Sequence, residues 1–115
     1  MMNSCNFIGR LVDEPKHFED ESGSRVVFTL AVDRDNGAAG VGADFLDFIA
    51  WGEVADTILN EYHKGDLMNV CNARAKVHTY VDSKQQKKRK TEYKVTSVYH
   101  LPDDKAHREK AAVAN

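Results

Sequence analysis

Two aromatic residues six positions apart, Phe45 and Trp51, are the pair in this sequence best suited to binding a flat ligand. The segment that holds them, residues 43–52, is mostly apolar, β-branched or aromatic and has no proline, which predicts a strand. Strand side chains alternate between two faces. If Leu46, Phe48 and Ala50 face the core, the two rings lie on an outer surface, where they could stack on unpaired nucleic-acid bases. The alternative is that both faces are covered and that all these residues are core.

A cluster of basic residues between positions 74 and 94 is the second feature suited to binding. This window contains eight lysines and arginines and only two acids, so it carries +6 in a chain of net charge −2. A local positive patch sets the field that a polyanion meets, whatever the total charge. The alternative is a solvated basic hairpin tip that binds nothing. The basic residues are Arg74, Lys76, Lys84, Lys87, Lys88, Arg89, Lys90 and Lys94.

The sequence contains little that would support a catalytic site or a metal site. Asp44 with Asp47, and Asp103 with Asp104, are paired carboxylates without a nucleophile or base at readable spacing, so we do not expect an enzyme. The histidines and cysteines lack Cys-x-x-Cys or His-x-x-x-His spacing. The glycine-rich segment 35–42 lacks the Gly-Lys-Ser/Thr ending of a phosphate-binding loop. We therefore expect no metal and no cofactor.

Length and composition indicate one globular domain. The chain has 115 residues, of which 42% are hydrophobic and 30% charged. No apolar run approaches the roughly 20 residues of a membrane helix, and the first residues do not resemble a signal peptide. We expect a cytoplasmic protein with reduced cysteines, no membrane contact, a domain at residues 1–103 and a short, charged, flexible tail at 104–115.

The order of predicted elements indicates the fold. Hydrophobic periodicity predicts strands at 5–12, 25–34 and 43–52, a helix at 53–63, and strands at 66–80 and 91–101. The polar segments 16–24 and 82–90 are interpreted as loops. Five strands with a helix between the third and fourth predict an all-β OB-fold, a Greek-key barrel that binds ligands on strands 2–3 and on the 1–2 and 4–5 loops. Residues 45–51 and the basic segment fall where that surface is expected, which favours the outer position of the rings.

The strand predicted at 66–80 changes phase along its length. Met68 and Val70 set one apolar phase, whereas Ala73 and Val77 set the opposite one. A β-bulge near Cys71–Asn72 would reconcile the two phases by inserting one residue. Beyond it, the outer face would combine basic groups with an aromatic ring, as expected of a single-strand binder: Arg74, Lys76, His78 and Tyr80.

Several segments together resemble the bacterial single-stranded DNA-binding protein family. They are residues 6–11 (NFIGRL), 28–32 (FTLAV), 43–52 (ADFLDFIAWG), 62–66 (YHKGD) and the strand that starts at 91 (TEYKV). Their order and spacing carry the similarity, which covers about residues 4–103.

The resemblance implies a protein that binds unpaired DNA without sequence preference and protects it in replication, recombination and repair. It also implies a homo-oligomer, usually a tetramer, although a dimer is possible. By position, Phe45, Trp51 and Tyr80 correspond to base-stacking aromatics. Four basic residues fall at or near positions that contact the DNA backbone: Arg10, Arg34, Arg74 and Lys76. The family's acidic, partner-recruiting C-terminal tip has no counterpart in this sequence, which closes with residues 111–115 (AAVAN).

Two alternatives remain open. An OB-fold replication accessory, such as a primosome or plasmid or mobile-element adaptor, would act mainly through protein contacts, and the acidic remainder of the chain favours it. RNA is the other alternative, because recognition of DNA over RNA requires a contact that senses the 2′-hydroxyl, which the sequence does not reveal.

Overall fold

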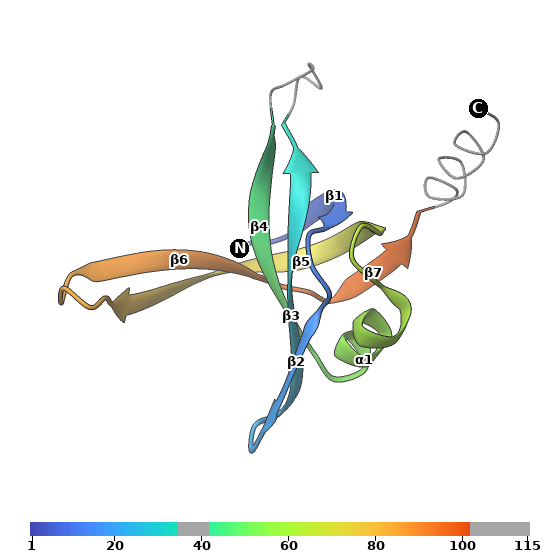
Figure 1. The fold of residues 1–115 in the computed structure, drawn as a ribbon. Helices are drawn as coiled ribbons and strands as arrows, with labels where there is room; N and C mark the ends of the chain where they lie inside the picture. The colour runs from blue at the N-terminus through green and yellow to red at the C-terminus, as the bar shows by residue number, and fades with distance from the viewer. Residues whose placement is uncertain (35–41, 102–115) are drawn as a thin grey trace.

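A computed structural model of the chain describes residues 1–34 and 42–101 (Figure 1). This part contains seven strands and one helix. They are β1 (Cys5–Leu11), β2 (Lys16–Asp20), β3 (Gly23–Asp33), β4 (Ala43–Trp51), α1 (Gly52–Glu61), β5 (Leu67–Val81), β6 (Lys87–Lys94) and β7 (Ser97–His100). The predicted tail at 104–115 and residues 35–41 of the predicted glycine-rich loop lie outside the described residues.

The strands close into a barrel. Neighbouring strands follow the order β1-β3-β4-β6-β5-β7, and β1 also pairs with β5, so five strands form a ring. The β4–β6 pairing is parallel and the others are antiparallel. The helix lies between β4 and β5 in the chain. This ring and the place of the helix confirm the predicted all-β, OB-type architecture.

The core includes the inner faces of β3 and β4, as alternation predicts. Val26, Phe28 and Leu30 are buried, and Phe48 lies across from Phe28 with ring centroids 5.1 Å apart. The helix buries Ala55 and Ile58 against the same core. Full burial of one large apolar side chain stabilises a fold by about 1.5–3 kcal/mol, so this cluster fixes which faces of β3 and β4 point outward.

Two local backbone features shape β1 and β5. Cys5 pairs with Ala73 and Phe7 with Val70, so β5 has one extra residue there, and Asn72 has a φ of 58°. This is the predicted bulge. Gly9 allows a close approach, because a Cβ at this position would lie 2.7 Å from the Ala31 carbonyl oxygen.

The interpretation of residues 16–24 as a loop is wrong. Residues 16–20 form β2, which pairs with β3 from Lys16↔Val27 to Asp20↔Gly23. All five β2 residues are exposed, so no buried stripe marks the strand in the sequence. Backbone pairing with β3 makes this segment a strand, and the resulting hairpin projects from the barrel (Figure 1).

The basic loop predicted at 82–90 is also shorter than expected. Only residues 82–86 form the turn, where the Asp82 carboxylate accepts hydrogen bonds from the backbone N–H groups of Lys84 and Gln86. The four basic residues from Lys87 to Lys90 belong to β6 and extend a long arm with β5 (Figure 1).

The strand predicted at 91–101 is divided into β6 and β7. The break coincides with Thr96, whose hydroxyl donates to the Asn72 carbonyl at the bulge (2.7 Å). Tyr99 is 56% exposed and Val95 is buried, although an unbroken strand would place both on one face.

The helix ends at Glu61, two residues before the predicted end. The His63 backbone N–H donates to the Asp66 carboxylate instead of continuing the helix, and that of Lys64 donates to Glu14. In the part of the chain that the structure describes, no helix is both long and apolar enough to cross a membrane.

Candidate nucleic-acid interface

The outer face of the barrel is defined here by the outward side chains of β4 and those in register with them on β3, β6 and β5. Phe45 is 66% exposed and Trp51 is 36% exposed. Both therefore point outward, as the alternation of β4 predicts. In the β3–β4 register Phe45 lies opposite Ala31, Asp47 opposite Thr29, and Trp51 opposite Arg25.

The β5–β6 arm continues this face. Ile49 pairs with Lys94 across the parallel β4–β6 contact, so Lys94 shares the outward side of Ile49. Farther out, the Lys90 ammonium lies 3.3 Å from the Asp47 carboxylate. Tyr80, which is 48% exposed, pairs with Lys88 near the tip of the arm. The outward rows of the arm are Arg74–Lys94, Lys76–Glu92, His78–Lys90 and Tyr80–Lys88.

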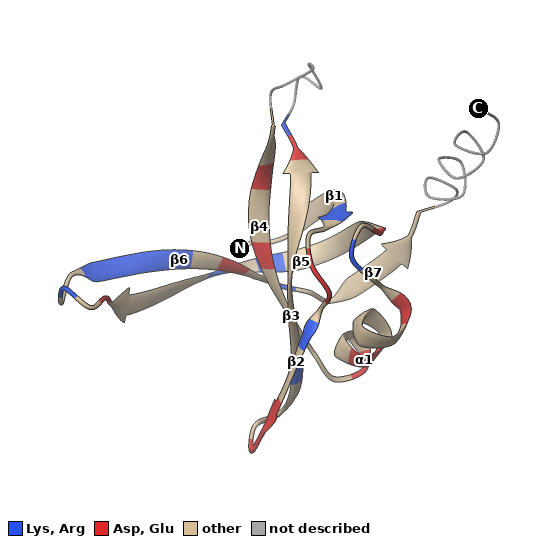
Figure 2. Ribbon diagram, viewed as in Figure 1, with Lys and Arg blue, Asp and Glu red and all other residues tan. Residues whose placement is uncertain are grey.

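The arrangement brings together most of the predicted residues but not all. Phe45, Trp51, Tyr80 and five of the eight basic residues of the 74–94 window share the outer face. Lys87 pairs with Val81 and Arg89 pairs with Thr79, so these two cations lie on the other side of the arm. Lys84 lies in the turn at its end. Figure 2 shows this concentration of positive charge along β6.

Two further predicted cations lie near Phe45. Arg10 is in register with Ala31, which is in turn in register with Phe45, so the three form one row across β1, β3 and β4. The Arg10 guanidinium donates to the Gly65 carbonyl oxygen (3.1 Å). Arg34 donates to the Asp44 carboxylate at 3.1 Å, and both side chains are more than half exposed. Such a pair adds little stability in water, so a phosphate can compete for the guanidinium.

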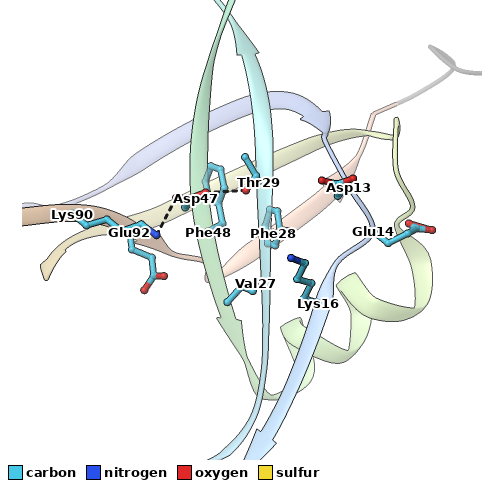
Figure 3. Close-up of a pocket in the computed structure, with 10 residues that line it drawn as sticks. All are labelled: Asp13, Glu14, Lys16, Val27, Phe28, Thr29, Asp47, Phe48, Lys90 and Glu92. Atoms are coloured by element: carbon cyan, nitrogen blue, oxygen red, sulfur yellow. Dashed lines mark hydrogen bonds and ion pairs between the residues drawn. The ribbon is translucent and has the colours of Figure 1, made fainter. Parts of the chain in front are cut away.

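A cavity of about 230 Å³ lies on this face (Figure 3). Asp47 is held there by the Thr29 hydroxyl, which donates at 2.8 Å, and by Lys90. The cavity lining carries four carboxylates against two lysines, so its net negative charge disfavours phosphate, whereas most outward cations lie along the arm. The arrangement suits uncharged bases at the centre and the phosphate backbone along the arm. The lining residues are Asp13, Glu14, Lys16, Val27, Phe28, Thr29, Asp47, Phe48, Lys90 and Glu92.

Sequence reasoning missed two residues at the end of this face. Arg25 lies between two rings, with its guanidinium carbon 5.1 Å from the centroid of Phe18 and 5.8 Å from that of Trp51. Phe18 was missed because residues 16–24 are interpreted as a loop, and Arg25, in the predicted strand 25–34, was missed because its contact with Phe18 depends on that hairpin. Residues 22–24 (SGS) are typical of a turn, which agrees with the turn at residues 21–22, but no apolar alternation marks β2 before it.

The carboxylate of Asp20 fixes the position of Arg25. It accepts a hydrogen bond from the Arg25 guanidinium (2.6 Å) and others from the Ser22 hydroxyl and backbone N–H. These bonds, first those from Ser22 and then that from Arg25, hold the pKa of the Asp20 carboxyl below its ordinary value. Within residues 1–34 and 42–101, no group of three or more His, Cys, Asp or Glu side chains is placed to hold a metal ion.

Comparison with known proteins agrees with this geometry. The sequence model of the single-strand binding protein family matches residues 2–101. The chain belongs to this family. The family resemblance expected from the sequence is thereby confirmed, and so is the interpretation of the chain as a binding protein rather than an enzyme.

Curated relatives carry the same description. Single-stranded DNA-binding protein 3 of Clostridium acetobutylicum is 39% identical over 82 residues, which cover 69% of this chain and 56% of the relative. Single-stranded DNA-binding protein A of Bacillus subtilis is 32% identical over 104 residues, which cover 88% of this chain and 60% of the relative. The single-stranded DNA-binding protein of Enterococcus faecalis is 35% identical over 90 residues, which cover 76% of this chain and 47% of the relative. The chain thus spans about half to two thirds of the length of these relatives.

Proposed function

We propose that this chain binds single-stranded DNA without sequence preference, using the outer face of the barrel. The observation that carries the proposal is the sharing of one face by three exposed aromatic rings and a row of cations. The names of the relatives, which are single-stranded DNA-binding proteins, support the same ligand.

In this proposal the rings and the cations have separate tasks. Phe45, Trp51 and Tyr80 stack on bases, and every base offers a π-face, so stacking tolerates any sequence. The outward lysines and arginines neutralise phosphates and release counterions, which makes the affinity fall as salt rises. The phosphate-binding set is Arg10, Arg34, Arg74, Lys76, Lys88, Lys90 and Lys94, with Lys84, Lys87 and Arg89 adding charge near the end of the arm.

We further propose that the protein protects unpaired DNA during replication, recombination and repair in the cytoplasm, as a homo-oligomer. The edge of β1 supports the oligomer, because β1 pairs with β3 only at Arg10 and Leu11, whereas its pairing with β5 runs from Cys5 to Arg10. Ile8 on this strand is 52% exposed. A strand edge with an exposed apolar residue is suited to pairing with a second chain. Light scattering after size-exclusion chromatography tests this: a tetramer or dimer is expected, and a monomer at all concentrations contradicts it.

A second candidate is a replication accessory that acts through protein contacts. The observation in its favour is the acidic end of the β2–β3 hairpin, where Glu19, Asp20 and Glu21 are all exposed (Figure 2). A negative projection of this kind would repel DNA and attract a basic protein surface. This candidate predicts weak DNA binding and a defined protein complex.

Titration of the intrinsic fluorescence of Trp51 with oligo(dT) tests the leading proposal. Trp51 is the only tryptophan in the sequence, so quenching reports one site. We expect strong quenching and tight binding at low salt, with weaker binding at higher salt. Absence of both quenching and binding at low salt contradicts the proposal and favours the accessory. A parallel titration with oligo(rU) measures the preference for DNA over RNA.

A further inference from the structure

Three outward side chains on adjacent strands form a continuous row at the base of the β2–β3 hairpin. Phe18 on β2 pairs with Arg25 on β3, and Arg25 pairs with Trp51 on β4. The guanidinium lies over both rings, 5.1 Å from the Phe18 centroid and 5.8 Å from the Trp51 centroid. We name this set, Phe18, Arg25 and Trp51, the stacking row.

The chemistry of the row suits bases. A guanidinium is planar and stacks on aromatic faces, and bases stack on both aromatic rings and guanidinium planes. Asp20 holds Arg25 through a 2.6 Å hydrogen bond, so the guanidinium is positioned before any ligand arrives. The same bond offsets the negative charge of Asp20, which would otherwise repel the DNA backbone.

We propose that Phe18 is a further base-stacking residue, so that the bound strand continues from Trp51 over Arg25 onto the β2–β3 hairpin. This inference rests on the proposed function of the outer face. Phe18 is 43% exposed although Arg25 lies over it, so a large part of the ring is open to a ligand. Lys16, two residues away on the same side of β2, is exposed and supplies a cation for a phosphate next to Phe18.

The competing explanation is that Phe18 packs against Arg25 only to hold the hairpin together. Side-chain pairs across neighbouring strands do stabilise hairpins. A leucine would preserve an apolar contact with the Arg25 side chain but would remove the π-face, whereas a tyrosine would keep both. The two explanations therefore predict different results for these substitutions.

The first experiment measures oligo(dT) affinity for Phe18→Leu and Phe18→Tyr in the full chain, with His17→Leu as the matched control. His17 lies on the other side of β2, where its ring is 2.6 Å from the Ser24 hydroxyl, so its loss disturbs the same hairpin. We expect the dissociation constant to rise about five- to tenfold for Phe18→Leu, which is the low end of the range for loss of one base–aromatic stack. We expect Phe18→Tyr and His17→Leu to stay within about twofold of the parent. A folded Phe18→Leu protein with the parent affinity overturns the inference.

The second experiment places a reporter at the site. In a Trp51→Phe, Phe18→Trp double variant the only tryptophan is at position 18, and residue 51 remains aromatic. We expect oligo(dT) to quench this tryptophan. If the double variant binds oligo(dT) without quenching, the inference fails while the proposed function stands. If the parent protein binds no single-stranded DNA, the proposed function fails and the inference fails with it.

Discussion

Replacement of Phe45 by alanine tests the stacking role most directly, because little of the fold depends on this ring. Phe45 is 66% exposed, so only about a third of its surface is buried. Since full burial of a phenylalanine stabilises a protein by about 1.5–3 kcal/mol, its removal should cost about 0.5–1 kcal/mol in unfolding free energy. A stacked base is worth about 1–3 kcal/mol, so the dissociation constant for oligo(dT) should rise about 5- to 150-fold.

The assay uses the natural reporter. Trp51 lies six residues away on the same side of β4, and the Phe45→Ala variant keeps it, so fluorescence quenching measures parent and variant alike. Phe45→Tyr is the matched control, because it retains an aromatic face at the same place, and its affinity should stay close to that of the parent.

Salt dependence separates stacking from charge in the same variant. Phe45 carries no charge, so the slope of log affinity against log salt should not change when the ring is removed. Two results would refute the reasoning. One is a folded Phe45→Ala protein that binds within twofold of the parent, and the other is a loss of affinity accompanied by a shallower salt slope.

Three other predictions follow from single contacts. Lys88→Ala should make the slope of log affinity against log salt shallower by about 0.7, as expected when one phosphate contact to a single strand is lost. Lys87→Ala, on the other side of the arm, should change this slope less, and a larger effect of Lys87→Ala would contradict the assigned face. The pKa of Asp20 lies below the ordinary 3.8, so its contribution to stability is present above that pH and is lost as the pH falls through the lower folded value. In denaturant unfolding at several acidic pH values, the free energy of unfolding should therefore decline less with falling pH for Asp20→Asn than for the parent. Identical pH profiles would contradict this. Gly9→Ala would place a methyl group 2.7 Å from the Ala31 carbonyl oxygen, so the free energy of unfolding should fall by about 1–3 kcal/mol. Denaturant unfolding should show a lower midpoint, and an unchanged midpoint would refute the close approach.

The barrel could be predicted from the sequence because its main strands have one buried face. Val26, Phe28 and Leu30 alternate with outward residues, and Phe48 and Ala50 do the same in the next strand. A one-residue shift would expose each of these side chains, so the pattern fixes which residues face outward. The outward position of Phe45 and Trp51 follows from the same pattern, before any contact is known.

The parts that could not be predicted depend on backbone pairing and turn geometry, which leave no apolar periodicity in the sequence. β2 buries no side chain and exists because its backbone pairs with β3. The break between β6 and β7 coincides with Thr96, whose hydroxyl bonds to the backbone at the bulge, 24 residues away in the chain. The side of the arm on which Lys87 and Arg89 lie depends on the length of the turn at 82–86, which was predicted too long. The errors in the strands therefore concern segments set by backbone pairing or turn geometry, whereas the helix ends early because Asp66 and Glu14 accept hydrogen bonds from the backbone N–H groups of residues 63 and 64.

The carboxylates on the outer face are compatible with the binding of a polyanion to the arm. Four carboxylates and two lysines line the cavity, and one of the lysines, Lys90, is paired with Asp47, so the centre of the face has a net negative charge. Cations concentrate instead along the arm, together with Tyr80. A polyanion attracted to the arm would meet a centre that repels phosphate but accepts uncharged rings, and its bases would turn inward toward Phe45 and Trp51. In the proposed binding mode, Asp47 and Glu92 would therefore favour one orientation of the strand, with the phosphates outward, and would not oppose binding as a whole.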